Sequence, residues 1–201
     1  MSDLFAFMTV GFRHIVGLDA ADHILFLAVL SAIYRPRDWR IALVVISAFT
    51  VGHSITLVLA VTRLLVLPSH VVEFLIPVTI AATGVENLWW RRQAERGVAV
   101  PGRPIFAAVF GLVHGAGFAG YLQSLFVDEI ALPLLGFNIG IELGQIVVLV
   151  GAAAVYLLVD AALRALPTQH SGGRRFQLRL VTVSALGLMV ATAWAIERFP
   201  R

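Results

Sequence analysis

Apolar runs about twenty residues long, separated by short arginine-rich segments, leave this chain few ways to fold. A helix needs roughly 20 residues to cross a hydrocarbon core about 30 Å thick. Five runs approach or exceed that length: residues 41–66, 70–90, 106–123, 131–166 and 180–199. The composition agrees, since 59% of the 201 residues are hydrophobic, only 13% are charged and the mean hydropathy is +0.90. We therefore predict an all-α fold, a polytopic membrane helix bundle that forms a single integral membrane domain over residues 1–201.

The first apolar segment is broken. Residues 4–17 are too short to span the bilayer, and a second short run, residues 24–34, follows Asp22 and His23. We expect the two pieces to form one broken or re-entrant element with polar groups at the break, where transporters often place ion sites. The bundle then has six transmembrane helices, or seven if the first piece counts separately.

The arginines predict the topology. Three lie in residues 35–40, four in 91–103 and three in 174–179, whereas one lies at position 63 and none in 124–130. Because arginine-rich segments favour the cytoplasmic side, these three groups should face the cytoplasm. The N-terminus lacks the basic region and small-residue cleavage site of a signal peptide, so we expect the first run to be retained. These signals predict a protein of the bacterial inner (cytoplasmic) membrane with its C-terminus outside.

Cysteine content and charge exclude several functional classes. The chain has no cysteine, which excludes disulfides, thiolate metal sites and cysteine nucleophiles. Its net charge of +3 comes from arginines that gather between apolar runs, where they set topology, so we expect no nucleic-acid partner. The expected partners are the lipid bilayer and a metal ion, with a homo-oligomer left open.

His114 lies at the centre of an apolar run, in the sequence Phe-Gly-Leu-Val-His-Gly-Ala-Gly-Phe. Lipid offers no hydrogen bond to a ring nitrogen at that depth, so other helices must bring polar groups to it. Gly111 and Gly115 are four residues apart, and Gly117 and Gly120 continue the nearly bare surface. We expect other backbones to approach closely around His114.

The groups that can meet His114 are imidazoles and carboxylates in or at the ends of other apolar runs. An ionised side chain at mid-membrane costs on the order of 2.5 to 3.5 kcal/mol, so such groups should pair or bind an ion. Imidazole and carboxylate without thiolate suit nickel, cobalt, zinc, iron or manganese. The candidate metal ligands are His14, Asp22, His23, His53, His114 and Glu142.

Other polar residues in the runs are expected to support these ligands or to fix helix packing. Residues on one helix face recur every three to four positions, as Asn138, Glu142 and Gln145 do. The expected supporting residues are Thr50, Ser54, Glu86, Asn138 and Gln145. In the simpler alternative, all these groups only hydrogen-bond one another and fix the packing.

Six motifs in register resemble one family, the HupE/UreJ family of hydrogenase and urease accessory membrane proteins. The motifs are Gly-Phe-Arg-His-Ile (11–15), Asp-His-Ile-Leu-Phe-Leu (22–27), Phe-Thr-Val-Gly-His-Ser-Ile-Thr-Leu (49–57), Val-Glu-Asn-Leu (85–88), Phe-Gly-Leu-Val-His-Gly-Ala-Gly-Phe-Ala (110–119) and Gly-Phe-Asn-Ile-Gly-Ile-Glu-Leu-Gly-Gln (136–145). The resemblance implies a small helical membrane protein that takes up nickel or cobalt. It also implies that the six candidate ligands handle the metal.

Three functions are compatible with these residues. The first is a permease or metal-binding membrane protein for a divalent transition metal of the nickel or cobalt type. The second is a zinc-dependent intramembrane hydrolase, in which Glu142 or Asp22 acts as general base and Ser54 stabilises the transition state. The third is bis-histidine haem b binding between facing helices. The sequence favours the first.

Overall fold

The computed structural model describes residues 2–17, 20–125, 131–165 and 172–200, and these residues form seven α-helices with no strand. The predicted all-α fold is thereby confirmed. The helices are α1 (Ser2–Val16), α2 (Ala21–Ser31), α3 (Trp39–Val61), α4 (Ser69–Glu95), α5 (Arg103–Leu125), α6 (Ala131–Ala165) and α7 (Gly172–Glu197), with a short 3₁₀ turn (Pro36–Asp38) before α3.

Four helices, α3, α4, α6 and α7, are long and apolar enough to cross a membrane. The pair α1 and α2, which bend by 68° between them, forms either a fifth, broken span or a re-entrant loop. This pair is the broken first element that the sequence predicts. Among the searched residues, the apolar part of α5 runs from Arg103 to Phe118, which is too short to count as a span by length alone. Helix α5 is nevertheless the sixth helix of the expected bundle, because it packs inside it.

Two helix ends differ from the expectation. The sequence predicts one apolar run over residues 41–66, but α3 ends at Val61, two residues before Arg63 with its positive φ of 60°, and Pro68 immediately precedes α4. Helix α7 begins at Gly172, within the polar tract before residue 180. Arginine is a good helix former, and Arg179 is buried against Asp160 of α6, so the polar composition of this tract does not make it a loop.

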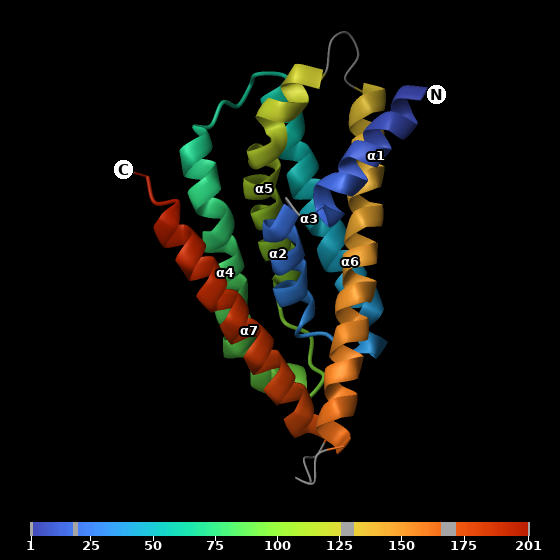
Figure 1. Ribbon diagram of the computed structural model, residues 1–201, viewed down its shortest axis with the longest axis vertical. Coiled ribbons are helices and arrows are strands. Elements are labelled where there is room, and N and C mark those ends of the chain that lie inside the picture. Colours follow the sequence, from blue (N-terminus) through green and yellow to red (C-terminus); the bar gives the residue numbers. More distant parts are fainter. Residues whose placement is uncertain (1, 18–19, 126–130, 166–171, 201) are drawn as a thin grey trace.

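The helices associate mainly in three pairs, α3 with α5, α1 with α6, and α4 with α7 (Figure 1). Glycines on each pair let backbones touch. A Cβ added at Gly111 of α5 would overlap the carbonyl of Phe49 on α3, and one at Gly140 of α6 would overlap the carbonyl of Met8 on α1. Short α2 packs against α4, α6 and α7 in the middle of the bundle.

The outer surface of the bundle is apolar, as a lipid-facing surface should be. Val44, Val51 and Ile55 of α3 are exposed, as are Val147 and Leu158 of α6. The buried core is also apolar and includes Phe26, Leu27, Val45, Phe49, Phe137 and Ile141. With apolar residues both inside and outside, the few polar side chains of the interior stand out.

The three arginine-rich segments meet at one end of the bundle. The Arg35 guanidinium donates to the carbonyl of Glu95 at 2.6 Å, which ties the segment before α3 to the end of α4. Arg179, near the start of α7, lies 3.3 Å from Asp160 of α6. The connection between α3 and α4 lies at the opposite end (Figure 1). The arginine alternation in the sequence therefore corresponds to two distinct ends in space, although most of the arginine-free segment 124–130 lies outside the described residues.

Candidate functional site

Four histidine rings meet inside the bundle, although they come from four different helices. His14 lies near the end of α1 and His23 in the first turn of α2, and their ring centroids are 4.6 Å apart. His114 of α5 is 5.1 Å from His23, and His53 of α3 is 6.1 Å from His14 and 6.2 Å from His23. His23, His53 and His114 are 6%, 0% and 1% exposed. We call these four residues the histidine cluster.

Glycines place two of the rings. Helix α5 approaches α3 so closely that a Cβ at Gly115 would overlap the His53 carbonyl. A side chain at this position would force the helices apart, and with them His53 and His114. The expectation that glycines around His114 permit close backbone approach is confirmed for Gly111 and Gly115.

Phenylalanine rings surround the histidine cluster. The Phe118 centroid lies 3.8 Å from that of His14, and Phe26 and Phe49 lie 5.0 Å and 5.2 Å from His114. Aromatic neighbours cover imidazole faces but offer no acceptor in the ring plane. The ring nitrogens therefore depend on the few polar atoms within reach.

Most of these nitrogens have no partner. The Thr79 hydroxyl lies 3.0 Å from Nε2 of His114, the single hydrogen bond found for these rings among the described residues. Buried ring nitrogens without a hydrogen bond in that part of the chain are His14 Nε2, His23 Nε2, His53 Nδ1, His53 Nε2 and His114 Nδ1. Leaving a buried polar atom unsatisfied costs about 1 to 3 kcal/mol, so such a concentration calls for a ligand.

The ring separations are close to those around a metal ion. A ligating nitrogen lies about 2.0 to 2.1 Å from the ion, which places the centroids of adjacent ligand rings about 4.5 to 5.2 Å apart. The His14–His23 and His23–His114 separations fall in this range, and His53 is about 1 Å too distant. Among the described residues, no group of three or more His, Asp or Glu side chains is arranged to hold a metal ion.

The two carboxylates expected among the ligands lie at the edges of the bundle. Asp22 Oδ2 accepts from Arg198 at 3.1 Å, while its Oδ1 is buried without a partner. Glu142 is exposed, and its Oε1 accepts from the Ser47 hydroxyl at 2.9 Å. The structure thus brings together the four histidines of the predicted set and places Asp22 and Glu142 in other contacts.

The expected supporting residues on α3 and α6 link these helices. The Thr50 hydroxyl is 2.9 Å from Gln145 Oε1, and Gln145 is fully buried with its Nε2 unpaired. Ser54 donates to the Thr50 carbonyl at 2.7 Å, within its own helix. Asn138 Oδ1 is buried without a partner. The contact between Thr50 and Gln145 therefore fixes α3 against α6 about one turn from His53.

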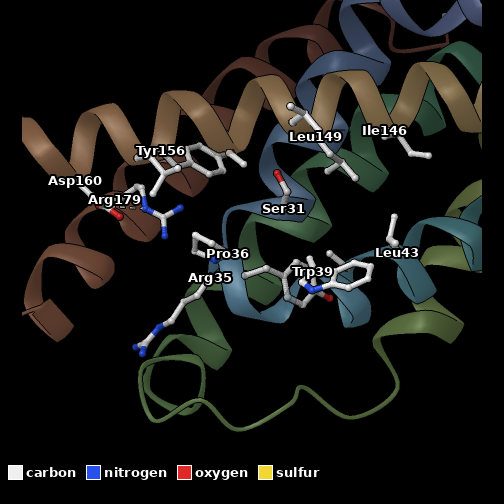
Figure 2. Close-up of a pocket in the computed structure, with 15 residues that line it drawn as sticks. Ser31, Arg35, Pro36, Trp39, Leu43, Ile146, Leu149, Tyr156, Asp160 and Arg179 are labelled. Carbon is white, nitrogen blue, oxygen red and sulfur yellow. Dashed lines mark ion pairs between the residues drawn. The ribbon is translucent and has the colours of Figure 1, made fainter.

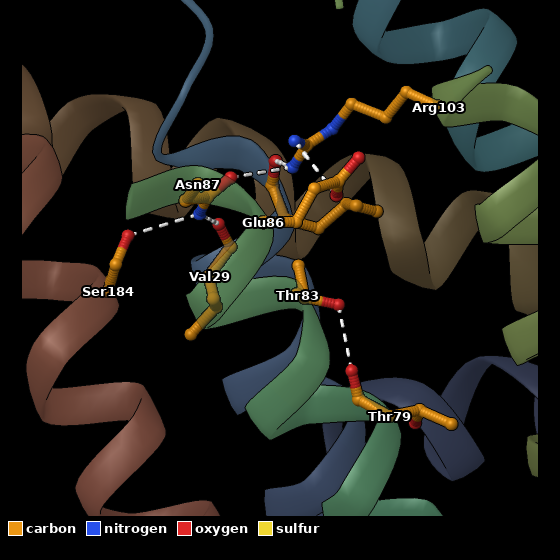
Figure 3. Close-up of polar contacts among 8 residues, drawn as sticks. Val29, Thr79, Thr83, Glu86, Asn87, Arg103 and Ser184 are labelled. Carbon is orange, nitrogen blue, oxygen red and sulfur yellow. Dashed lines mark hydrogen bonds and ion pairs between the residues drawn. The ribbon is translucent and has the colours of Figure 1, made fainter. Parts of the chain in front are cut away.

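Glu86 belongs to a different polar network, at the arginine-rich end (Figure 3). Its Oε2 lies 3.1 Å from the buried guanidinium of Arg103, which also donates to Asn87 Oδ1 at 2.9 Å. Asn87 in turn donates to Ser184 of α7 at 3.1 Å. Glu86 therefore joins α4, α5 and α7 and does not contact the histidines.

The residue that the sequence interpretation missed is Thr79, the hydrogen-bond partner of His114. A signal for it exists in the sequence. Thr79, Thr83 and Asn87 recur every four residues on the apolar helix α4, and all three are buried. Figure 3 shows Thr83 donating back to the Thr79 carbonyl, at 2.9 Å, below the Glu86 network.

One cavity lies away from the histidines. It is a groove of about 360 Å³ between α3 and α6 at the arginine-rich end (Figure 2). Its lining is mostly apolar, with Arg35, Asp160 and Arg179 at one end, and its Ser31 hydroxyl donates to a carbonyl of its own helix. No histidine is among its lining residues.

Comparison with protein-family profiles matches residues 1–198 to the HupE / UreJ protein family. The chain belongs to the HupE / UreJ family. The resemblance seen in the six motifs is therefore confirmed over nearly the whole chain. Among curated proteins and solved structures nothing matches. For this HupE / UreJ protein, the family assignment and the apolar helices together identify an integral membrane protein.

Chemically, the cluster of this HupE / UreJ protein is a set of nitrogen donors in an apolar cage. Neutral imidazole suits nickel, cobalt and zinc among the divalent ions. Burial among phenyl rings disfavours a charged imidazole, which keeps nitrogen lone pairs available for an ion. The donor set and the unpaired nitrogens are of the type that a divalent transition metal prefers, although His53 lies beyond ligand spacing.

Proposed function

We propose that this protein binds a divalent transition metal of the nickel or cobalt type in the histidine cluster and carries it across the bacterial inner membrane. The observation that carries the proposal is the convergence of unpaired ring nitrogens from His14, His23, His53 and His114. Pure helix packing would leave these buried atoms unsatisfied at a cost of about 1 to 3 kcal/mol each, whereas a bound ion satisfies several at once.

The long distance from His53 to His14 and His23 favours transport over permanent retention of the ion. A transporter must release what it binds, so its site should have moderate affinity. The pairs His14–His23 and His23–His114 lie at ligand spacing and His53 is about 1 Å too distant, so full coordination requires a movement that can be reversed.

The zinc hydrolase alternative is less well supported. It needs a carboxylate base beside the metal and a donor for the transition state. Asp22 and Glu142 are held by Arg198 and Ser47, and the Ser54 hydroxyl is bonded to its own helix. These contacts would have to break before any of the three residues served the reaction.

The proposal includes an orientation. The arginine-rich end, with Arg35, Arg103 and Arg179, faces the cytoplasm, and the end that carries the α3–α4 connection and the C-terminus faces outward. Fusing a reporter that is active only outside the cytoplasm to the C-terminus tests this orientation. Activity supports it, and an inactive reporter in a membrane-inserted protein contradicts it.

Flux in proteoliposomes tests the function. Nickel, cobalt and zinc are offered in turn to the wild-type protein, to His53→Ala and to His114→Ala, with an indicator trapped inside. His70→Ala is the matched control, because His70 is an exposed histidine in the first turn of α4, outside the cluster. We expect flux that both cluster variants lose and the control keeps. A folded wild-type protein that moves none of these ions refutes transport.

Metal analysis of the purified protein, prepared without a metal-binding tag, separates the alternatives. Weak, reversible binding that His114→Ala abolishes agrees with transport. Near-stoichiometric zinc kept through washing, with substrate turnover lost in His114→Ala, would instead establish the hydrolase. A haem spectrum would establish the bis-histidine cofactor site.

A further inference from the structure

A second cavity lies on the side of the histidine cluster that faces away from the arginine-rich end. It has a volume of about 320 Å³ and is bounded by the last turns of α3, the α3–α4 connection, the first turns of α4 and the second half of α5. Its walls include Thr56, Ser69, Glu73, Gly117 and Gly120.

The inner wall of this cavity is one helical turn from the histidines. Thr56 follows His53 by three residues on α3, and Gly117 follows His114 by three residues on α5. Three residues correspond to about 4.5 Å along a helix. On both helices, the innermost lining residues of the cavity therefore lie about one turn from a histidine of the cluster.

Glycines keep the α5 side of the cavity open. A Cβ at Gly120 would meet nothing within 4 Å, and one at Gly117 would first meet the tip of the Ile76 side chain, at 3.0 Å. In contrast, Gly111 and Gly115 on the same helix are pressed against the α3 backbone. The glycines of α5 thus serve close packing beside the histidines and open space beyond them.

The rim of the cavity carries a negative charge. Glu73 is exposed, and its carboxylate has no ion pair or hydrogen bond among the described residues. The groove in Figure 2, at the other end of the bundle, has arginines at its rim. A carboxylate at the mouth of a cleft raises the local concentration of cations, whereas arginines repel them.

The size of the cavity suits a hydrated ion. Each water occupies about 30 Å³ in the liquid, so the cavity has room for about ten waters, or for a divalent ion with a shell of about six. The groove of similar volume near Arg179 offers mostly apolar contacts to such a shell.

We propose that this cavity is the vestibule through which a hydrated divalent cation reaches the histidine cluster from outside, with Glu73 as the carboxylate that first attracts it. The inference rests on the proposed transport function for its cargo. The vestibule itself is a statement about water access, which can be measured whether or not the protein transports metal.

Cysteine labelling measures that access. The chain has no cysteine, so each single-cysteine variant carries one thiol. Gly120→Cys places it in the vestibule, where there is space, and Leu112→Cys places it on the exposed, lipid-facing side of the same helix. A membrane-impermeant thiol reagent is added to intact cells, and the labelling rates of the folded variants are compared.

We expect Gly120→Cys to react at least about tenfold faster than Leu112→Cys, because only a hydrated thiol ionises readily. Thr56→Cys, deeper in the vestibule, should react with a small cationic reagent and more slowly with a bulky one. Equal, slow labelling of Gly120→Cys and Leu112→Cys in folded protein overturns the vestibule, even if metal transport is intact.

The role of Glu73 has its own readout. Glu73→Gln should raise the KM for metal flux about threefold or more at low salt with kcat unchanged, and high salt should reduce the difference. Glu73→Asp, which keeps the carboxylate, should have a KM close to that of the wild type. Equilibrium binding to the histidine cluster in detergent should be the same in all three proteins. A Glu73→Gln protein with the wild-type KM at low salt overturns the role of Glu73, whereas absence of flux in the wild type refutes the transport function alone.

Discussion

Replacing Gly115 by alanine tests whether close contact between α3 and α5 sets the histidine cluster. The added Cβ would lie 3.1 Å from the Cα of His53 and closer to its carbonyl oxygen, whereas ordinary contact begins at 3.4 Å. The obstacle is backbone, so no side chain can rotate away. The helices must therefore separate by several tenths of an ångström to about 1 Å, and overpacking of this kind costs about 1 to 3 kcal/mol.

The same shift acts on metal binding. Metal–nitrogen bonds tolerate deviations of only about 0.2 Å, so moving α5 away from α3 removes either His114 or His53 from a common ion. We expect nickel affinity to fall at least about tenfold, which corresponds to about 1.4 kcal/mol. Gly120→Ala is the matched control, because its Cβ meets nothing within 4 Å on the same helix.

Two measurements in detergent give the answer. Tryptophan fluorescence follows thermal unfolding, with a midpoint about 2 to 4 °C lower per kcal/mol lost. Equilibrium dialysis gives the nickel affinity. Gly115→Ala should have a lower unfolding midpoint and a lower nickel affinity than the wild type, whereas Gly120→Ala should match the wild type in both. Two variants that unfold and bind alike would refute the claim that backbone contact positions the cluster.

Three further predictions concern other parts of the structure. Arg103→Gln should destabilise the protein by about 3 to 5 kcal/mol by leaving Glu86 without its partner, and the double variant with Glu86→Gln should recover part of the loss, as measured by thermal unfolding. Nickel affinity should change little as pH falls from 7.5 to 5.5, because burial of His23, His53 and His114 disfavours the protonated imidazole that would compete with the ion, and a calorimetric titration in which affinity falls at least about tenfold over this range would refute that burial. His23→Ala should weaken nickel binding more than Asp22→Asn does, since His23 lies between two other rings whereas Asp22 contacts Arg198; the reverse order in equilibrium dialysis would make Asp22 a ligand.

The sequence predicted the histidine cluster because burial costs act on residue types. An imidazole in an apolar run must find a partner wherever the fold places it. That argument gave six candidate ligands, and the rings of four of them, His14, His23, His53 and His114, lie together. It could not say which nitrogens stay unpaired, because ring orientation depends on packing against phenylalanines distant in sequence.

The carboxylates were harder to place because their partners are distant in the chain. Asp22 pairs with Arg198, which follows it by 176 residues. Glu142 and Gln145 are three residues apart on α6. Three residues correspond to about 300° of rotation, so their side chains point about 60° apart around the helix axis. At the edge of a packed surface this angle separates a buried Gln145 from an exposed Glu142.

The glycine contacts also decide how the residues of the histidine cluster can move. Where two backbones touch, as at Gly111 between α3 and α5 and at Gly140 between α1 and α6, neither helix can slide past the other, so each pair moves as a rigid body. His53 and His114 belong to one such body, His14 belongs to another, and His23 lies on α2 beyond the 68° bend. When these bodies tilt relative to one another, His53 and His114 keep their spacing, while His14 and His23 move away from them. Under the proposed transport function, this change of tilt releases the ion without deforming any single helix.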